Sequence, residues 1–185
     1  SGAAGTVIKC DGIRFTTLVS NTTLNLNAIA WHPSGSYALL AGNAGTVLRY
    51  DGTAFTAVTG VPAVDLFGIA WTGDGSRALI VGRGGRVLDY NGTGIVELTG
   101  VGTPNDLLSV DWNSAGYALI VGAAGTAVRF NGTFQVLTTG VGTNLHAVKF
   151  SPDGKGAIAA GANGRVIRYD GVAFSSISTA TGATF

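Results

Sequence analysis

Residues 42–55 read GNAGTVLRYDGTAF, and similar stretches recur along the chain. The other copies begin at Gly2, Gly82, Gly122 and Gly161 and read GAAGTVIKCDGIRF, GRGGRVLDYNGTGI, GAAGTAVRFNGTFQ and GANGRVIRYDGVAF. Each copy contains an Asp-Gly or Asn-Gly pair, which favours a tight β-hairpin because both residues tolerate positive φ. Successive pairs are separated by 40, 40, 40 and 39 residues. The chain is therefore built from a repeat of about 40 residues.

A second marker runs in step with the first, since large aromatic residues recur at Trp31, Trp71, Trp112 and Phe150. Each repeat predicts four short strands, here called a to d. Strand a is expected at 26–31, 66–71, 107–112 and 145–150, and strand b at 37–41, 77–81, 117–121 and 156–160. Strand c follows the G-x-x-G loop at 46–50 and its equivalents, and strand d is expected at 55–59, 95–99, 134–138 and 174–178. No helical stretch is apparent.

The strands are apolar on both faces, which a one-sided sheet would not need. Two-sided burial and a period of about 40 residues are typical of β-propeller blades, whose sheets are covered by their neighbours. We therefore predict an all-β protein, a single β-propeller domain over 1–185. Its repeat units are about 1–25, 26–65, 66–106, 107–144 and 145–185.

The strand count is uneven, because the opening segment carries only strands c and d. This predicts four complete repeats and an N-terminal half-blade in a five-bladed-type ring that lacks one a–b hairpin. The half-blade is expected to stay open, to pack unusually, or to be completed by two strands from another chain. Exposed strand edges invite pairing, so the expected partners are another protein or a second copy of this chain.

Composition narrows the function classes. The formal net charge is +1 and charged residues are 11% of the chain, so a nucleic-acid partner is not expected. No apolar run is long enough for a membrane span. Abundant Gly, Thr and Asn favour a secreted or cell-surface protein over a cytoplasmic one. Sequons at Asn21, Asn91 and Asn131 permit glycosylation, although two of them fall in Asn-Gly turns.

Two stretches resemble known repeats. Residues 146–170, HAVKFSPDGKGAIAAGANGRVIRYD, resemble WD40 and YVTN propeller repeats in the F-S-P-D-G turn after strand a. The G-x-x-G-T-V-x-x-Y-D-G run resembles more closely the propeller repeats of bacterial and archaeal secreted proteins and of the Ycf48-like photosystem assembly factors. The resemblance implies blade architecture over nearly the whole chain. The Trp-Asp and Gly-His dipeptides of WD40 repeats and the sialidase Asp-box are absent.

The sequence offers few groups for catalysis. His32 and His146 lie in different repeats without a paired ligand, so no metal site and no cofactor are expected. Gly82 to Gly85 lacks the Lys-Ser/Thr of a phosphate loop. The single cysteine, Cys10, replaces the Tyr or Phe of the other copies and is interpreted as a small core or edge residue. Asp111 and Lys149 share one strand-a position in adjacent repeats, which suggests an ion pair between blades. A basic residue recurs on strand c at Lys9, Arg49, Arg129 and Arg168, and most carboxylates stand in turns, at Asp11, Asp51, Asp74, Asp153 and Asp170.

The d–a and b–c loops differ between repeats while the strands agree. The resemblance implies that ligands bind at the face these loops form, although unconstrained loops would vary in the same way. The candidate binding residues on this face are Asn43, Asp65, Arg83, Asn105, Asp106, Asn144, His146 and Asn163. The prediction is a non-catalytic scaffold for protein interaction or assembly. The alternative is a carbohydrate-binding, lectin-like propeller with a glycan as partner, and an enzyme is disfavoured because no catalytic set converges.

Overall fold

The computed structural model describes residues 2–177, which form eighteen strands and no α-helix. Sixteen strands build four antiparallel four-stranded sheets in which neighbours in sequence are neighbours in the sheet. The first sheet contains β3 (Leu26–Trp31), β4 (Ala38–Gly42), β5 (Val47–Tyr50) and β6 (Phe55–Ala57). The second contains β7 (Leu66–Trp71), β8 (Ala78–Gly82), β9 (Val87–Tyr90) and β10 (Ile95–Leu98).

The third and fourth sheets repeat this order. The third contains β11 (Leu107–Trp112), β12 (Ala118–Gly122), β13 (Ala127–Phe130) and β14 (Phe134–Leu137). The fourth contains β15 (Leu145–Phe150), β16 (Ala157–Gly161), β17 (Val166–Tyr169) and β18 (Phe174–Ile177). The all-β prediction is confirmed, and the bounds predicted for strand a match in all four sheets. Strands b and c begin one residue later than predicted. In the first three sheets strand d ends one or two residues earlier than predicted, and in the fourth sheet its predicted last residue, 178, lies outside the described residues.

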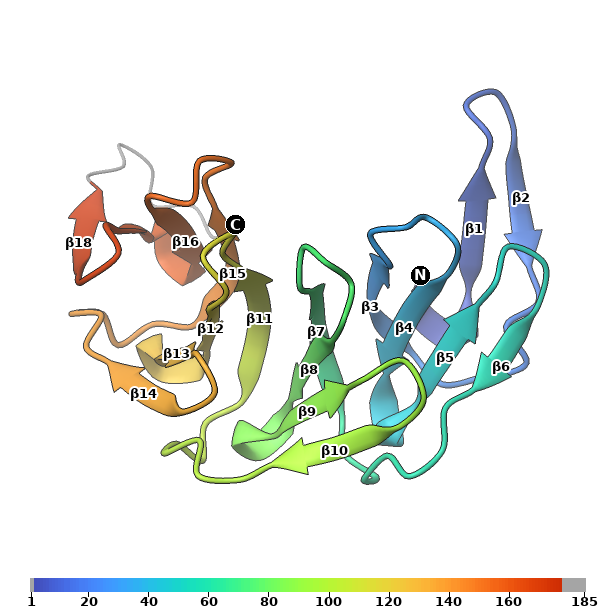
Figure 1. Cartoon of the computed structure of the whole chain (residues 1–185), viewed down its shortest axis with the longest axis horizontal. Coiled ribbons are helices and arrows are strands. Elements are labelled where there is room, and N and C mark those ends of the chain that lie inside the picture. The colour runs from blue at the N-terminus through green and yellow to red at the C-terminus, as the bar shows by residue number, and fades with distance from the viewer. Residues whose placement is uncertain (1, 178–185) are drawn as a thin grey trace.

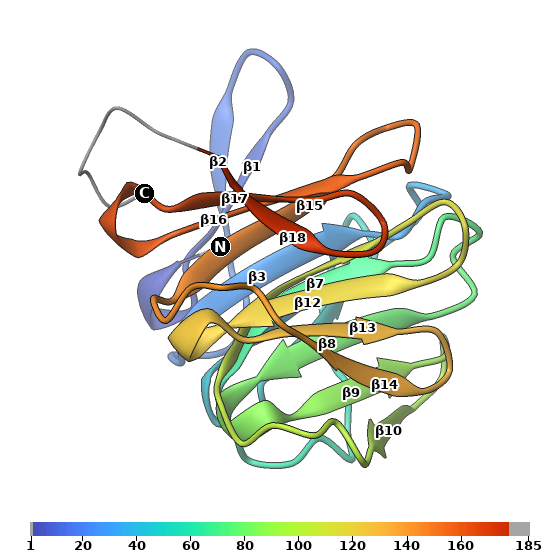
Figure 2. The ribbon, with the colours of Figure 1, turned by 90° about the vertical axis from the view of Figure 1, so that its left-hand side faces the viewer.

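The four sheets stand side by side around a common axis and form an open arc (Figure 1). Their first strands, β3, β7, β11 and β15, are innermost and contact one another in that order. The remaining two strands, β1 (Val7–Cys10) and β2 (Phe15–Leu18), pair only with each other. Both views show this hairpin projecting beyond the complete sheets (Figure 2). Within residues 2–177 no sheet closes on itself and none fills the arc between the fourth sheet and the hairpin.

The core lies between the sheets rather than in one central layer. Strands β4, β8 and β12 are buried at all five positions, so both faces of each are covered. Leu39 of β4, for example, packs against Ile80 and Tyr90 of the next sheet. Burial on both faces explains why these strands are apolar throughout. In β16 the pattern breaks, because Ile158 is exposed.

Each hairpin between strands c and d is closed by its Asp or Asn. The Oδ1 atom of Asp51 accepts hydrogen bonds from the backbone N–H of Thr53 and Ala54 at 2.9 and 2.8 Å. The Tyr50 ring stacks on Phe55 at 4.6 Å between centroids, and its hydroxyl donates to the carbonyl of Gly52 at 2.7 Å. The repeated carboxylates and amides are therefore turn residues, as the sequence predicted.

Each G-x-x-G loop forms a single 3-10 turn, which the sequence had not indicated. These turns span η1 (Ala3–Gly5), η2 (Asn43–Gly45), η3 (Arg83–Gly85), η4 (Ala123–Gly125) and η5 (Ala162–Gly164). A Cβ at Gly122 would collide with the carbonyl of Asp106, and Gly125 has a φ of +70°. The first glycine thus permits close approach of the d–a loop that leads into the same sheet, and the second permits a left-handed turn.

Cys10 lies exposed at the end of β1, so its interpretation as a core residue is wrong and that as an edge residue is right. The physical reason is that no further sheet covers this strand. Two of the four basic residues of strand c lie over aromatic rings: the Cζ atoms of Arg49 and Arg129 are each 4.3 Å from the ring centroids of Tyr37 and Tyr117, respectively. None of the helical segments in residues 2–177 is long and apolar enough to cross a membrane.

Candidate functional site

The predicted loop face is held together by a repeated hydrogen bond. The Oδ1 atom of a d–a loop residue accepts the backbone N–H of the middle residue in the preceding 3-10 turn. The pairs are Asp65 with Ala44 at 3.0 Å, Asp106 with Gly84 at 2.8 Å, Asn144 with Ala124 at 3.0 Å and Asn25 with Ala4 at 3.0 Å. Three of the predicted binding residues therefore bind the neighbouring repeat, which is a structural use of their side chains.

The other predicted residues lie at the same end of the sheets. Arg83 forms an ion pair with Asp65 at 3.4 Å. Asn43 accepts a hydrogen bond from Asn27 at 2.8 Å, and Asn105 donates to Thr126 at 2.8 Å. His146 is exposed on β15, at the register shift between Leu145 and Ala147, and Asn163 is the middle residue of η5. The structure joins Asp65 with Arg83, and binding by these residues stays a prediction.

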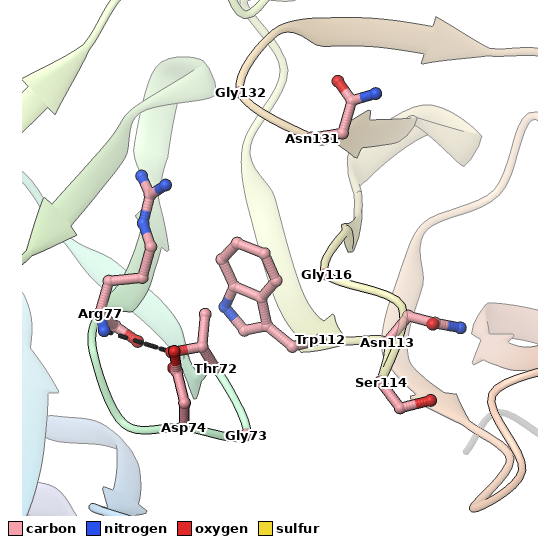
Figure 3. A pocket seen from close by; sticks show the side chains of 10 residues that line it. All are labelled: Thr72, Gly73, Asp74, Arg77, Trp112, Asn113, Ser114, Gly116, Asn131 and Gly132. Atoms are coloured by element: carbon pink, nitrogen blue, oxygen red, sulfur yellow. Dashed lines mark hydrogen bonds between the residues drawn. The ribbon is translucent and has the colours of Figure 1, made fainter.

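A hollow of about 510 Å³ lies at the opposite end, between the a–b turns of the second and third sheets. Figure 3 shows the Trp112 ring between the Thr72–Gly73 turn and the Asn113–Ser114 turn. None of the eight predicted residues lines it. Its lining residues are Thr72, Gly73, Asp74, Arg77, Trp112, Asn113, Ser114, Gly116, Asn131 and Gly132.

This hollow exists because one turn residue is short. At the first position of the a–b turn, His32 hydrogen-bonds the carbonyl of Gly75 in the next sheet at 3.0 Å, and Asn113 donates to that of Gly154. Thr72 occupies this position in the second sheet and turns its hydroxyl to the carbonyl of Arg77 at 3.1 Å. The change from His or Asn to Thr at this turn position is the sequence signal that could have predicted the hollow.

The electrostatics of the hollow are set by one anion and one neutralised cation. Hydrogen bonds from the Thr72 hydroxyl and from the N–H and hydroxyl of Ser76 lower the pKa of Asp74 to about 2. Arg77 is paired with Asp89 at 2.8 Å. The Nε1 atom of Trp112 is buried and has no hydrogen-bond partner among residues 2–177, whereas Nε1 of Trp71 donates to the carbonyl of Ala30 at 3.3 Å. These groups suit a polar, uncharged ligand better than an anion.

The innermost strands enclose a second hollow of about 450 Å³ near the axis. The predicted ion pair between blades lies here and is confirmed: Nζ of Lys149 is 2.6 Å from Oδ1 of Asp111. The Oδ2 atom of Asp111 also accepts the backbone N–H of Phe150 at 2.7 Å. This carboxylate joins the third and fourth sheets. Among residues 2–177, no three His, Cys, Asp or Glu side chains gather to hold a metal ion.

The arc between the fourth sheet and the β1–β2 hairpin is bordered by apolar side chains, and we call it the opening. Leu119 on β12 packs against the following sheet, but its counterpart Ile158 is 52% exposed. Trp71 is 8% exposed because the preceding sheet covers it, but its counterpart Trp31 is 53% exposed. The same contrast holds for the other exposed residues along the opening, Ile8, Phe15 and Ile29.

Comparisons with known proteins agree on the fold. No protein-family model matches the chain, and no curated protein matches it. Among solved structures, the chain is similar to Kuenenia stuttgartiensis hydrazine synthase with a TM-score of 0.69 and 16% identity, over 91% of this chain and 53% of that one. It is similar to U3-55K with a TM-score of 0.71 and 10% identity, over 98% of this chain and 57% of that one.

This chain therefore spans little more than half the length of either neighbour. Both neighbours are propellers of the WD40 type, and the match extends over nearly all of this chain. At such low identity the likeness concerns the fold alone. Together with the four repeated antiparallel sheets, it shows that the chain has a propeller-like repeat fold.

Proposed function

We propose that this chain is a non-catalytic scaffold that binds a protein partner. The observation that carries the proposal is the set of exposed apolar side chains on the two borders of the opening, which includes Ile8, Trp31 and Ile158 at 55%, 53% and 52% exposure. Large apolar side chains that are exposed together mark interaction sites in soluble proteins. The resemblance of the repeated G-x-x-G-T-V-x-x-Y-D-G run to the Ycf48-like assembly factors supports the same function.

The chemistry of the titratable groups supports a non-catalytic role. Turn hydrogen bonds from Ala54 and Thr53 lower the pKa of Asp51 to about 2, and Asp74 is similarly lowered. These hydrogen bonds show that both carboxylates serve the turns in which they stand. His32 packs between the rings of Tyr37 and Trp71 and hydrogen-bonds Gly75, so it serves the contact between sheets.

The test is selection from a random peptide library displayed on phage, with the full chain immobilised. Peptides are expected to be enriched on the wild type and on Val136→Asp, a matched variant at an exposed position on the outermost strand β14. The same peptides should be lost on Ile158→Asp, because a charge there opposes apolar docking. Absence of enrichment on the wild type, or equal retention by both variants, would contradict binding at the opening.

The lectin-like alternative is favoured by one observation, the hollow beside Trp112, which combines an indole ring with Asp74, Asn113 and Asn131. Sugars bind through such pairings of an aromatic ring with polar groups. A glycan array would test it, with Gly73→Tyr as the variant. A Cβ at Gly73 meets no atom within 4 Å, so the ring can be accommodated and would obstruct the hollow. Glycan signals lost in this variant would support the alternative, and a blank array with the wild type would reject it.

A further inference from the structure

The inner edge of β1 lacks the strand that its counterparts have. In the first complete sheet β5 pairs with β6 on one side and with β4 on the other, with Tyr50 opposite Ala38 and Leu48 opposite Leu40. Strand β1 pairs with β2 alone among the described residues. Its Val7 is buried against the first sheet, whereas Ile8 is exposed toward the opening. The hairpin therefore supplies the two outer strands of a four-stranded sheet, and the register of β1 against β2 is the same as in the complete sheets.

The other side of the opening holds a hollow of about 520 Å³, lined in part by Ile158, Gly156 and Arg168. Its counterpart in the first sheet receives the ring of Trp71 against Tyr37 and His32. In the fourth sheet Gly156 stands where Tyr37 stands in the first, so the space for an aromatic ring is larger. The corresponding space in the third sheet receives Phe150 against Tyr117, at 5.4 Å between centroids. Each occupied hollow of this kind holds the aromatic residue that ends strand a of the following sheet.

From these two observations we infer that the opening binds a β-hairpin of a partner polypeptide. One hairpin strand extends the β1 ladder, and a large aromatic residue at the end of the other fills the hollow beside Gly156. This inference rests on the proposed function and specifies its partner as a hairpin with the pattern of the chain's own strands a and b. The hairpin continues the pattern of the three contacts between complete sheets. In each of these contacts, the aromatic residue at the end of strand a packs on a side chain of the preceding sheet.

Charge adds a second criterion for the partner. The hollow in the fourth sheet is lined by Lys149, Lys155 and Arg168 and by a single carboxylate, Asp153. Arg49 and Arg129, the counterparts of Arg168, lie over tyrosine rings that Gly156 does not provide. An aromatic residue of the hairpin would restore that contact to Arg168. Because Lys149 is already paired with Asp111, a carboxylate near the tip of the hairpin would complement Lys155.

The experiment uses the full chain and a synthetic peptide with the sequence of residues 66–82, LFGIAWTGDGSRALIVG. Ala78 lies opposite Tyr90 in the second sheet, and Cys10 holds the position of Tyr90 in β1. Each cysteine peptide is supplied as a mixed disulfide with thionitrobenzoate, so that attack by the Cys10 thiolate forms the new disulfide and releases thionitrobenzoate. The peptide with Ala78→Cys should therefore be trapped by the exposed Cys10, because facing residues of paired strands lie within disulfide range. A peptide with Leu79→Cys is the control, since a shift of one residue turns the thiol to the other face.

The expected result is trapping at least about 10-fold faster for the Ala78→Cys peptide than for the control peptide, because a paired register fixes which thiol faces Cys10. Adding Trp71→Ala to the trapping peptide, or Ile158→Asp to the protein, should slow trapping by about 10-fold, and Val136→Asp should leave it unchanged. Equal rates for the two cysteine positions, or no trapping, would overturn the inference. If library peptides still bind at the opening in that case, the proposed function stands and only the hairpin is rejected.

Discussion

Trp71 and Trp31 occupy the same position in consecutive repeats, yet one is 8% exposed and the other 53% exposed. Trp71 packs on His32 at 4.7 Å and on Tyr37 at 5.6 Å between centroids, both from the preceding sheet. Within residues 2–177, no four-stranded sheet precedes Trp31, and its ring makes an edge contact to Tyr50 in its own sheet. Whether a residue at this position is buried therefore depends on whether a neighbouring complete sheet covers it, and not on the type of residue.

The largest difference is expected between the two tryptophans. Trp71→Ala should lower the free energy of unfolding by about 4 kcal/mol, because it removes a buried ring and leaves a cavity. Trp31→Ala should cost about 1 kcal/mol or less, since half of its surface is already in water. Urea denaturation followed by circular dichroism measures both. Equal losses would mean that Trp31 is covered in solution, for example by a second copy.

The second comparison uses Leu119 and Ile158, which are equivalent positions on β12 and β16. Leu119→Ala should destabilise the fold by about 3 kcal/mol, because Leu119 is fully buried between the third and fourth sheets. Ile158→Ala should cost about 1 kcal/mol, because its side chain is 52% exposed among the described residues. The same denaturation assay applies. A cost at Ile158 that approaches that at Leu119 would show that the opening is filled.

A smaller effect should not depend on the opening at all. Ala4 and Ala124 have φ values of +50° and +51° in their 3-10 turns, where Gly84 stands in the second sheet. Ala124→Gly should stabilise the protein by about 0.5–1 kcal/mol through relief of left-handed strain, and Gly84→Ala should cost a similar amount. Ala4→Gly, beside the opening, should behave like Ala124→Gly. A clear difference in melting temperature between these two variants would show that the turn next to the opening is held differently.

The smallest effect concerns acid stability. The pKa of Asp51 is about 2 in the folded chain against an ordinary 3.8, because the N–H of Ala54 and the Thr53 side chain bond its anion. The contribution of Asp51 to the free energy of unfolding is therefore complete above the ordinary pKa and is lost as pH falls from about 4 to 2. Asn91 and Asn131 hold this turn without a charge. The urea midpoint of the wild type should fall between pH 5 and 2, and in Asp51→Asn it should fall by less. An equal fall in both proteins would contradict the role of the Asp51 anion in this turn.

Much of the fold could be predicted from the sequence because its signals are local. The Asp51-Gly52 and Asn91-Gly92 pairs specify hairpins through backbone geometry alone, and alternation with apolar runs fixes the strands between them. The bounds of strand a followed from Trp31 and its equivalents. The loop residues Asp65 and Asp106 were correctly placed at one end of the sheets, but their hydrogen bonds to the preceding turn depend on how two repeats meet.

The hollow beside Trp112 and the exposure along the opening could not be read in the same way. At the equivalent positions, His32 and Asn113 reach the turn of the next sheet and hydrogen-bond it. The shorter Thr72 does not, so a space remains between the two turns. The sequence by itself determined the repeat, the four-stranded sheets and the tight turns, since each depends on contacts within about 40 residues. Only the tertiary structure decided which equivalent residues are buried, because Trp71 and Trp31 differ solely in whether a neighbouring sheet excludes water from them.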